Sequence, residues 1–163
     1  MVMPSEPIRD IMRRTMLNLA YIEERAQGDG PFEVTQLINS FLGALAHPWE
    51  ALQTDLMAIP LADALARGWP NITKERPTDR DPNSLGDLVR LMRNSFAHGN
   101  ITFLPGPKGE IQSLRVWNTL SHGGPRTWGT IITVADARLF LVRFAELAEE
   151  IHTRRSTTTP RTA

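Results

Sequence analysis

Apolar residues recur at helical spacing in two long stretches in the first half of the chain. One stretch covers residues 7–26, and the second covers residues 33–47. We expect Pro48 to end the second helix, because the residue before a proline disfavours the helical conformation. Residues 49–67 predict short helical pieces that are broken at Pro60. The pattern therefore predicts two long helices followed by short ones.

The next stretch, residues 67–83, is polar and contains three prolines. We expect a mobile loop here, because long irregular connections in compact domains are often functional or disordered. A third long helix begins at Ser84, where the sequence SLGD resembles a capping box in which Asp87 reaches back to the first free amide. Gly99 follows the last helical residue and predicts a left-handed C-terminal cap.

Beyond the third helix, the pattern changes to short stretches rich in β-branched and aromatic residues, separated by turns. These stretches are residues 101–104, 111–118 and 127–134. They predict a small hairpin unit of two or three strands. A last helix is expected over about 134–152, with Thr133 as its cap. Residues 154–163 have the composition of a disordered tail.

The length of 163 residues and the apolar content of 41% suit a single domain, which we place at residues 1–153, before the tail. The formal net charge is zero. The chain therefore has no overall basic field for nucleic acid, and a site for a polyanion must be a local cluster. Arg outnumbers Lys by sixteen to two, a bias that codon composition explains as well as phosphate binding does.

The residue content disfavours several other kinds of site. The chain has no Cys, which excludes disulfides, thiolate metal sites and a Cys nucleophile. His47, His122 and His152 have no metal-ligand spacing with each other or with carboxylates, so we expect no metal and no cofactor. No apolar run reaches membrane length and no signal-peptide pattern opens the chain, so we expect a cytoplasmic protein without membrane contact.

The third long helix carries the candidate chemistry, in the sequence RLMRNSFAHGN at residues 90–100. At about 100° per residue, one stripe faces the core and is formed by Leu85, Leu88, Val89, Met92 and Phe96. Arg93 lies at the edge of this stripe. The opposite side of the helix carries a second seam, formed by Asp87, Leu91, Asn94 and His98.

Arg93 and His98 are five residues apart, which separates them by about 140° around the helix axis. They diverge within one chain, but they converge if the helix packs against a two-fold copy of itself along the second seam. Asp87, Leu91 and Asn94 would then form the dimer seam. Two arginines and two histidines would cluster around the axis, and His is the side chain best suited to proton transfer near neutral pH.

These residues resemble a known family. RNSFAH matches the R-polar-x-x-x-H signature of HEPN domains, and RNSFAHGNI is similar to the fuller form in one bacterial subset. VTQLINSFLGALAHPWE resembles the same subset, and the order of elements fits over about residues 7–152. The resemblance implies an all-α fold: an up-and-down helical bundle with a small β-hairpin inserted before the last helix.

Many HEPN proteins are homodimers that act as metal-independent endoribonucleases of toxin–antitoxin or antiphage systems, with one composite site built by both protomers. The resemblance therefore implies RNA as substrate, a homodimer, and a cognate antitoxin protein as a candidate partner. Arg93 would contact the scissile phosphate, Asn94 would support the site, and His98 would move protons so that the RNA 2′-hydroxyl can attack. HEPN toxins silenced by a nucleotidyltransferase carry Tyr where this chain has Asn100, so we do not expect that regulation.

Two other interpretations fit the same residues. A catalytically silent HEPN-like dimer would bind RNA, a nucleotide or a partner protein through the same groove, and the neutral net charge favours it over a general RNA binder. A purely structural helical dimer would use the polar seam only to set its register. Binding that survives His98→Ala, without cleavage by the wild type, would support the silent dimer.

Overall fold

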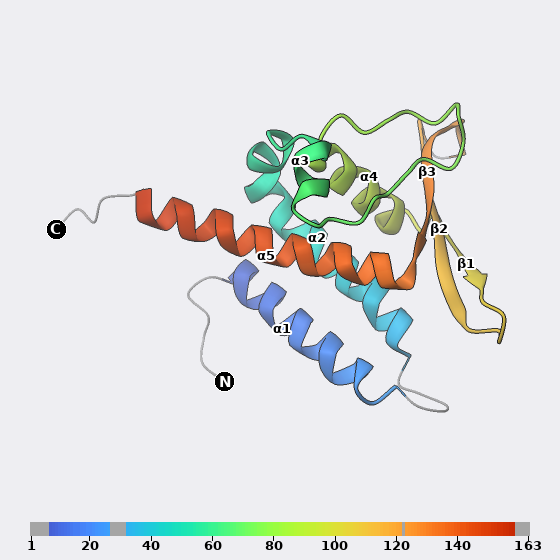
Figure 1. Ribbon diagram of the computed structural model, residues 1–163, viewed down its shortest axis with the longest axis horizontal. Coiled ribbons are helices and arrows are strands. Elements are labelled where there is room, and N and C mark those ends of the chain that lie inside the picture. The colour runs from blue at the N-terminus through green and yellow to red at the C-terminus, as the bar shows by residue number, and fades with distance from the viewer. Residues whose placement is uncertain (1–6, 27–31, 122, 159–163) are drawn as a thin grey trace.

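The structure is a computed structural model that describes residues 7–26, 32–121 and 123–158 (Figure 1). It is 57% helical and contains a three-stranded antiparallel sheet. The helices are α1 (Pro7–Glu23), α2 (Glu33–Met57), α3 (Leu61–Ala66), α4 (Leu85–Ala97) and α5 (Val134–Thr158). The strands are β1 (Ile101–Pro105), β2 (Ile111–Thr119) and β3 (Arg126–Thr133). Within these ranges, no helix has both the length and the apolar character that crossing a membrane requires.

The sheet corrects the expectation of an all-α fold with a simple hairpin. β1, β2 and β3 pair in sequence order, and each strand lies within one residue of its predicted range. Leu114 of β2 pairs with Ile132 of β3, and both side chains are buried. This buried face of the sheet packs against α4 and α5. The sheet is therefore a wall of the core and not an appendage to a helical bundle.

α2 is the central helix and packs against α1, α4 and α5. It continues through Pro48, so the predicted end there is wrong. A proline inside a helix costs about 3 kcal/mol, because it removes a backbone hydrogen bond and crowds the preceding turn. Trp49, Leu52 and Leu56 are buried beyond it, at roughly 1.5–3 kcal/mol each, which outweighs that cost. The predicted break at Pro60 is confirmed, since α3 begins directly after it.

α5 begins where predicted but ends later. The Thr133 hydroxyl oxygen accepts a hydrogen bond from the Asp136 amide at 3.0 Å, which confirms the predicted cap. The helix runs to Thr158, so the first part of the predicted disordered tail, 154–158, is helical. Arg155 in this part pairs with Asp55 of α2 at 2.5 Å. The remaining tail residues, 159–163, lie outside the described part of the chain.

The polar stretch 67–83 is irregular, as predicted, but it is fastened to the sheet. The Glu75 amide donates a hydrogen bond to the Gly129 carbonyl at 2.8 Å, and the Arg80 amide donates to the Thr127 carbonyl at 3.0 Å. Figure 1 shows this connection between α3 and α4 passing beside β3. The stretch, called here the sheet-edge segment, therefore extends the edge of the sheet, and the expectation of a free loop is wrong.

Ion pairs strengthen the attachment of the sheet-edge segment. Arg126 of β3 donates to Asp79 at 2.6 Å and to Glu75 at 2.7 Å, and Arg115 of β2 donates to Glu75 at 2.8 Å. Asp79 is buried. Burial alone would raise the pKa of Glu75, but the hydrogen bonds from Arg126 and Arg115 outweigh burial and lower it. The lowered pKa of Glu75 favours its charged form, which holds the segment together with the ion pair between Asp79 and Arg126.

α4 begins at its predicted cap. The Ser84 hydroxyl oxygen accepts a hydrogen bond from the Asp87 amide at 3.1 Å, which confirms half of the capping box. The Asp87 carboxylate accepts instead from the amide of Asn83, one residue before the cap, at 3.1 Å. Gly86 lies so close to α2 that an added Cβ would fall 2.6 Å from the Met57 amide nitrogen. The start of α4 therefore packs backbone against backbone on α2.

Candidate functional site

The sequence RNSFAH lies at the end of α4, and it contains most of the positions of this helix that the other described residues leave open. Most other side chains of α4 are buried. The open part is a narrow band, called here the outward strip, formed by Arg90, Arg93, Asn94, Ala97 and His98. Spacings of three and four residues place these positions on one helix face. The structure thus brings the three predicted site residues to one accessible surface.

Arg93 has an incomplete set of hydrogen bonds. Its Nη1 donates to Asn94 Oδ1 at 3.1 Å. Its Nε is buried and has no hydrogen-bond partner among the described residues. A buried donor without an acceptor costs about 1–3 kcal/mol. An anion that lets this guanidinium turn outward and use its remaining donors therefore lowers its free energy.

His98 is the C-cap residue of α4, and its side chain is exposed. Gly99 follows with a φ of +66°, and its amide donates to the Phe96 carbonyl at 3.1 Å. The Asn100 amide donates to the Ser95 carbonyl at 2.9 Å. These two bonds form a Schellman motif and confirm the predicted left-handed cap. Because the chain leaves the helix at Gly99, no further turn covers the imidazole.

Arg93 and His98 lie on opposite edges of the outward strip. Helical geometry separates them by about 140° around the axis. Asn94 lies between these two directions and contacts Arg93 directly. The structure therefore joins two of the predicted site residues, Arg93 and Asn94, and places His98 on the far edge of the same surface.

The predicted second seam is wrong for two of its residues. Asp87 and Leu91 are each 4% exposed, so their side chains cannot form the dimer seam that was predicted for them with Asn94. Both point away from the helical stripe, as expected, but β2 and the sheet-edge segment cover that side of α4. Asn94 and His98 follow on the same side and stay accessible. If α4 contacts a second copy of the chain, that contact would use the outward strip.

A buried polar network supports the middle of the motif. The Asn118 side-chain amide of β2 donates to the Leu91 carbonyl at 2.7 Å and to the Ser95 hydroxyl oxygen at 2.9 Å. The Ser95 hydroxyl donates to the Leu91 carbonyl at 2.9 Å. Phe96 stacks on Phe41 of α2, with ring centroids 4.8 Å apart. The last turns of α4 are therefore fixed by β2 on one side and by α2 on the other.

The Asp87 carboxylate binds two guanidinium groups. Arg80 donates to it from both Nη atoms, at 2.7 and 2.9 Å, and Arg90 donates from Nη2 at 2.7 Å. Burial alone would raise the pKa of Asp87. The hydrogen bonds from Arg80, Arg90 and the Asn83 amide outweigh burial and lower the pKa to about 2. The side chains of Asp87, Arg80 and Arg90, called here the Asp87 cluster, connect the sheet-edge segment to the outward strip.

Two of the residues described above, Arg90 and Asn118, were not selected from the sequence, although the sequence carried a signal for each. Arg90 lies three residues after Asp87 and three before Arg93, a spacing that makes side chains neighbours on a helix. Asn118 continues the inward alternation of β2, and a polar residue at an inward position normally has a buried partner. Arg80 is different, because an irregular segment has no period from which its direction could be predicted.

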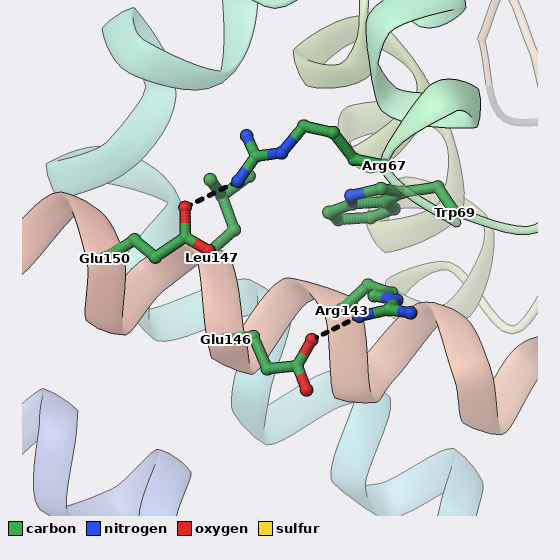
Figure 2. A pocket seen from close by; sticks show the side chains of 6 residues that line it. All are labelled: Arg67, Trp69, Arg143, Glu146, Leu147 and Glu150. Carbon is green, nitrogen blue, oxygen red and sulfur yellow. Dashed lines mark hydrogen bonds and ion pairs between the residues drawn. The ribbon is translucent and has the colours of Figure 1, made fainter.

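Charged side chains also converge between α5 and the end of α3. A cavity of about 120 Å³ lies there. Figure 2 shows the side chains that line it, Trp69 among them. Arg67 pairs with Glu150 at 2.5 Å, and Arg143 pairs with Glu146 at 2.9 Å. Each arginine is matched by a carboxylate, so this cavity attracts an anion less than the outward strip does. Within the described part of the chain, no three His, Asp or Glu side chains gather as metal ligands would.

One comparison with known proteins identifies a relationship. The family model described as HEPN pEK499 p136 matches residues 1–155. The match spans nearly the whole chain, and it includes α4 with the outward strip and the three strands. No curated protein matches the chain, and no solved structure matches it.

Proposed function

Because this chain belongs to the family described as HEPN pEK499 p136, we propose that it is a metal-independent endoribonuclease that works as a homodimer. The observation that carries the proposal is the outward strip, which presents Arg93, Asn94 and His98 on one accessible surface. Arg93 also has a donor without a partner among the described residues. An unsatisfied cation and a proton-transfer group are what cleavage of an RNA phosphodiester requires.

RNA supplies its own nucleophile, the 2′-hydroxyl beside the scissile phosphate. One His98 accepts the proton while the 2′-oxygen attacks phosphorus, and Arg93 stabilises the negative charge that grows on the phosphate oxygens. The bond from phosphorus to the 5′-oxygen then breaks, and the same His98, now protonated, gives its proton to this oxygen. The products are a 2′,3′-cyclic phosphate and a 5′-hydroxyl. Asn94 holds the Arg93 guanidinium through the Nη1–Oδ1 bond.

The directions of Arg93 and His98 favour a composite site built by two protomers. If two outward strips pack about a two-fold axis, Arg93 of one protomer can face His98 of the other. The contact would then use Asn94 and Ala97, since Asp87 and Leu91 are buried. Ala97 has a small side chain, so two copies of α4 can approach closely at that point.

Cleavage of a mixed RNA pool in the presence of EDTA tests the chemistry. We expect the wild type to release fragments with 2′,3′-cyclic phosphate ends. His98→Ala should lower the rate by about 10²–10⁴-fold, the usual contribution of a general acid or base. A 2′-deoxy substitution at the cut site should stop the reaction. Loss of activity in EDTA with rescue by a divalent ion, or efficient cutting of single-stranded DNA, would reject this mechanism.

A mixture of Arg93→Ala and His98→Ala proteins tests the composite site. Each homodimer lacks one group and should be inactive, whereas a mixed dimer has one Arg93 and one His98 on different chains. We expect the mixture to regain a fraction of the wild-type rate after subunit exchange. Differently tagged subunits provide the control, because co-purification of both tags shows that exchange has occurred. A mixture that exchanges and stays inactive would reject a site that spans two protomers.

A toxin or antiphage effector is the biological role that we propose for this activity, with RNA in the cytoplasm as its target and a cognate antitoxin as its regulator. Expression of the wild type in a bacterial host should arrest growth, and expression of His98→Ala should not. Equal growth of both strains would contradict the toxin role. RNA binding by the wild type without cleavage, unchanged in His98→Ala, would instead indicate a catalytically silent HEPN-like dimer.

A further inference from the structure

The Asp87 cluster has its anion inside the protein and its cations at the surface. Asp87 is buried, whereas the side chains of Arg80 and Arg90 are 36% and 46% exposed. The carboxylate therefore lies beneath two guanidinium groups that reach solvent. Its neighbours in the chain fix its place, since the Asn83 amide donates to the same carboxylate at 3.1 Å.

The charges in the Asp87 cluster do not cancel. One carboxylate faces two guanidinium groups, which leaves one positive charge. Arg80 uses both Nη atoms on Asp87, but Arg90 reaches it through Nη2 alone. A guanidinium has five N–H donors. Arg90 therefore keeps donors that have no partner among the described residues.

Arg90 lies one helical turn before Arg93 and Asn94 on the outward strip. Side chains three and four positions apart on a helix are neighbours, with about 5–6 Å between their Cβ atoms. The strip itself contains no carboxylate. Two arginines with unused donors thus stand side by side on an accessible surface, and a polyanion that contacts both would relieve their repulsion.

We propose that Arg90 is a phosphate-binding residue of the RNA site, and that Asp87 and Arg80 are positioning residues that fix its direction. This inference rests on the proposed ribonuclease function. Arg90 would hold the phosphate next to the one that Arg93 contacts, so that consecutive phosphates follow the axis of α4. Arg suits this task because its fork can bind the buried carboxylate with one edge and a phosphate with another.

The experiment compares Arg90→Gln with Arg138→Gln. Arg138 is a matched control, because its side chain is 47% exposed and pairs with a carboxylate, Glu23, at 2.7 Å. With a short single-stranded RNA at low salt, Arg90→Gln should raise KM about tenfold and leave kcat near the wild-type value. It should also reduce the slope of log affinity against log salt by about 0.7, the loss expected for one phosphate contact. Arg138→Gln should change none of these quantities.

A conservative variant separates charge from shape. Arg90→Lys keeps the charge without the fork, so it should retain the salt slope while it restores only part of the affinity. Thermal unfolding of each variant gives the folding control, since the loss of an ion pair with a half-exposed partner has little effect on stability. A fall in kcat with unchanged KM and salt slope would overturn the proposal, because Arg90 would then act through Arg93 and not on a phosphate.

Binding of an RNA with a 2′-deoxy cut site separates this inference from the proposed function. If the wild type cleaves RNA and Arg90→Gln keeps both its KM and its salt slope, the Arg90 contact is rejected and the ribonuclease stands. If nothing cleaves but Arg90→Gln weakens binding more than Arg138→Gln does, the contact stands and catalysis is rejected. A wild type that neither binds nor cleaves RNA rejects both.

Discussion

The two ends of α4 belong to one helix but have different surroundings. At its start, Ser84 caps the helix and the buried Asp87 carboxylate is bound by two arginines and a backbone amide. At its end, Asn94 is half-buried, His98 is exposed, and Arg93 keeps a buried donor without a partner among the described residues. The Asp87 carboxylate at the first end has its hydrogen bonds satisfied inside the protomer, whereas the Arg93 guanidinium at the second end has not.

This difference shows that the angle around a helix does not decide burial by itself. Asp87 and Leu91 point to the same side as Asn94 and His98. β2 and the sheet-edge segment cover that side only along the first turns. On this side, α4 is thus anchored along its first half and presents side chains along its second half. Substitutions of Asp87 or Leu91 should act on the free energy of unfolding, and substitutions in the outward strip should act on RNA cleavage.

The largest contrast is expected between two variants of α4 that place a new carboxylate at a buried position and at an exposed position. Leu91→Asp buries a charge among apolar side chains and should cost more than about 4 kcal/mol, enough to unfold the protomer. Ala97→Asp places the same charge on the outward strip, where water solvates it, and should change the free energy of unfolding by less than about 0.5 kcal/mol. Chemical denaturation of both variants measures the difference.

Ala97→Asp should also lower activity, for a reason that does not involve folding. Ala97→Asp is expected to lower RNA cleavage about tenfold or more at low salt, because its carboxylate repels the phosphates that Arg93 attracts. Ala97→Asn is the uncharged control and should retain more activity. A folded Leu91→Asp protein, or an unfolded Ala97→Asp protein, would contradict the division of α4 into two halves.

Removal of the Asp87 side chain should have the next largest effect. Asp87→Ala leaves Arg80, Arg90 and the Asn83 amide without their shared acceptor. Loss of one partner of a buried pair costs about 3–5 kcal/mol, and we expect about 3 kcal/mol here because both arginines can reach water. Urea denaturation measures the loss, and a cost below about 1 kcal/mol would show that the cluster does not anchor α4.

Acid should weaken the same anchor without any mutation. The pKa of Asp87 is about 2 in the folded protein, below the ordinary value of 3.8. A lowered pKa means that the charged form stabilises the fold above about pH 4, and that this contribution, about 2 kcal/mol, is lost as the pH falls toward 2. The measurement is the free energy of unfolding at several pH values. Asp87→Asn is the control, and the wild type should lose more stability than this variant does.

The helix cap should give the smallest effect. Ser84→Ala removes the acceptor of the Asp87 amide, a hydrogen bond of 3.1 Å, and should cost about 1 kcal/mol. RNA cleavage by the remaining folded protein should be unchanged. Thr133→Ala, which removes the corresponding cap of α5, provides a comparison of similar size. A drop in cleavage from Ser84→Ala that exceeds the unfolded fraction would mean that the two ends of α4 are coupled.

The parts of the fold that were predicted correctly depend on residues close together in the chain. The caps at Ser84 and Thr133, and the left-handed turn at Gly99, each follow from a few neighbouring residues. The three strands follow from short stretches rich in β-branched and aromatic residues that are separated by turns. Local propensity decided these features, and tertiary packing did not change them.

The parts that were predicted wrongly depend on distant residues. α2 continues through Pro48 because side chains beyond it are buried against other helices. The sheet-edge segment is held because Glu75 and Asp79 meet Arg115 and Arg126, which follow 40 and 47 positions later. A composition rich in charge and proline indicates a loop, but it cannot indicate which arginines will lie beside it.

The predictions for the candidate site also divide into those that local sequence decided and those that distant residues decided. The motif was sufficient to select Arg93, Asn94 and His98, and the structure places all three on the outward strip. Their catalytic roles remain predictions, as does the homodimer. The helical angle was insufficient for Asp87 and Leu91, because the covering strand and segment come from other parts of the chain.

Because Gly86 lies close to α2, a small tilt of α4 at this contact would displace the far end of the helix. An added Cβ would fall 2.6 Å from the Met57 amide nitrogen, so a side chain there would push the two helices apart. His98 lies twelve residues further along, about 18 Å at 1.5 Å per residue. A tilt of about 3° at the pivot would then move the imidazole by about 1 Å, a misplacement that can cost about 10²-fold in rate. The small size of Gly86 thus helps to determine where the His98 imidazole lies in the proposed site.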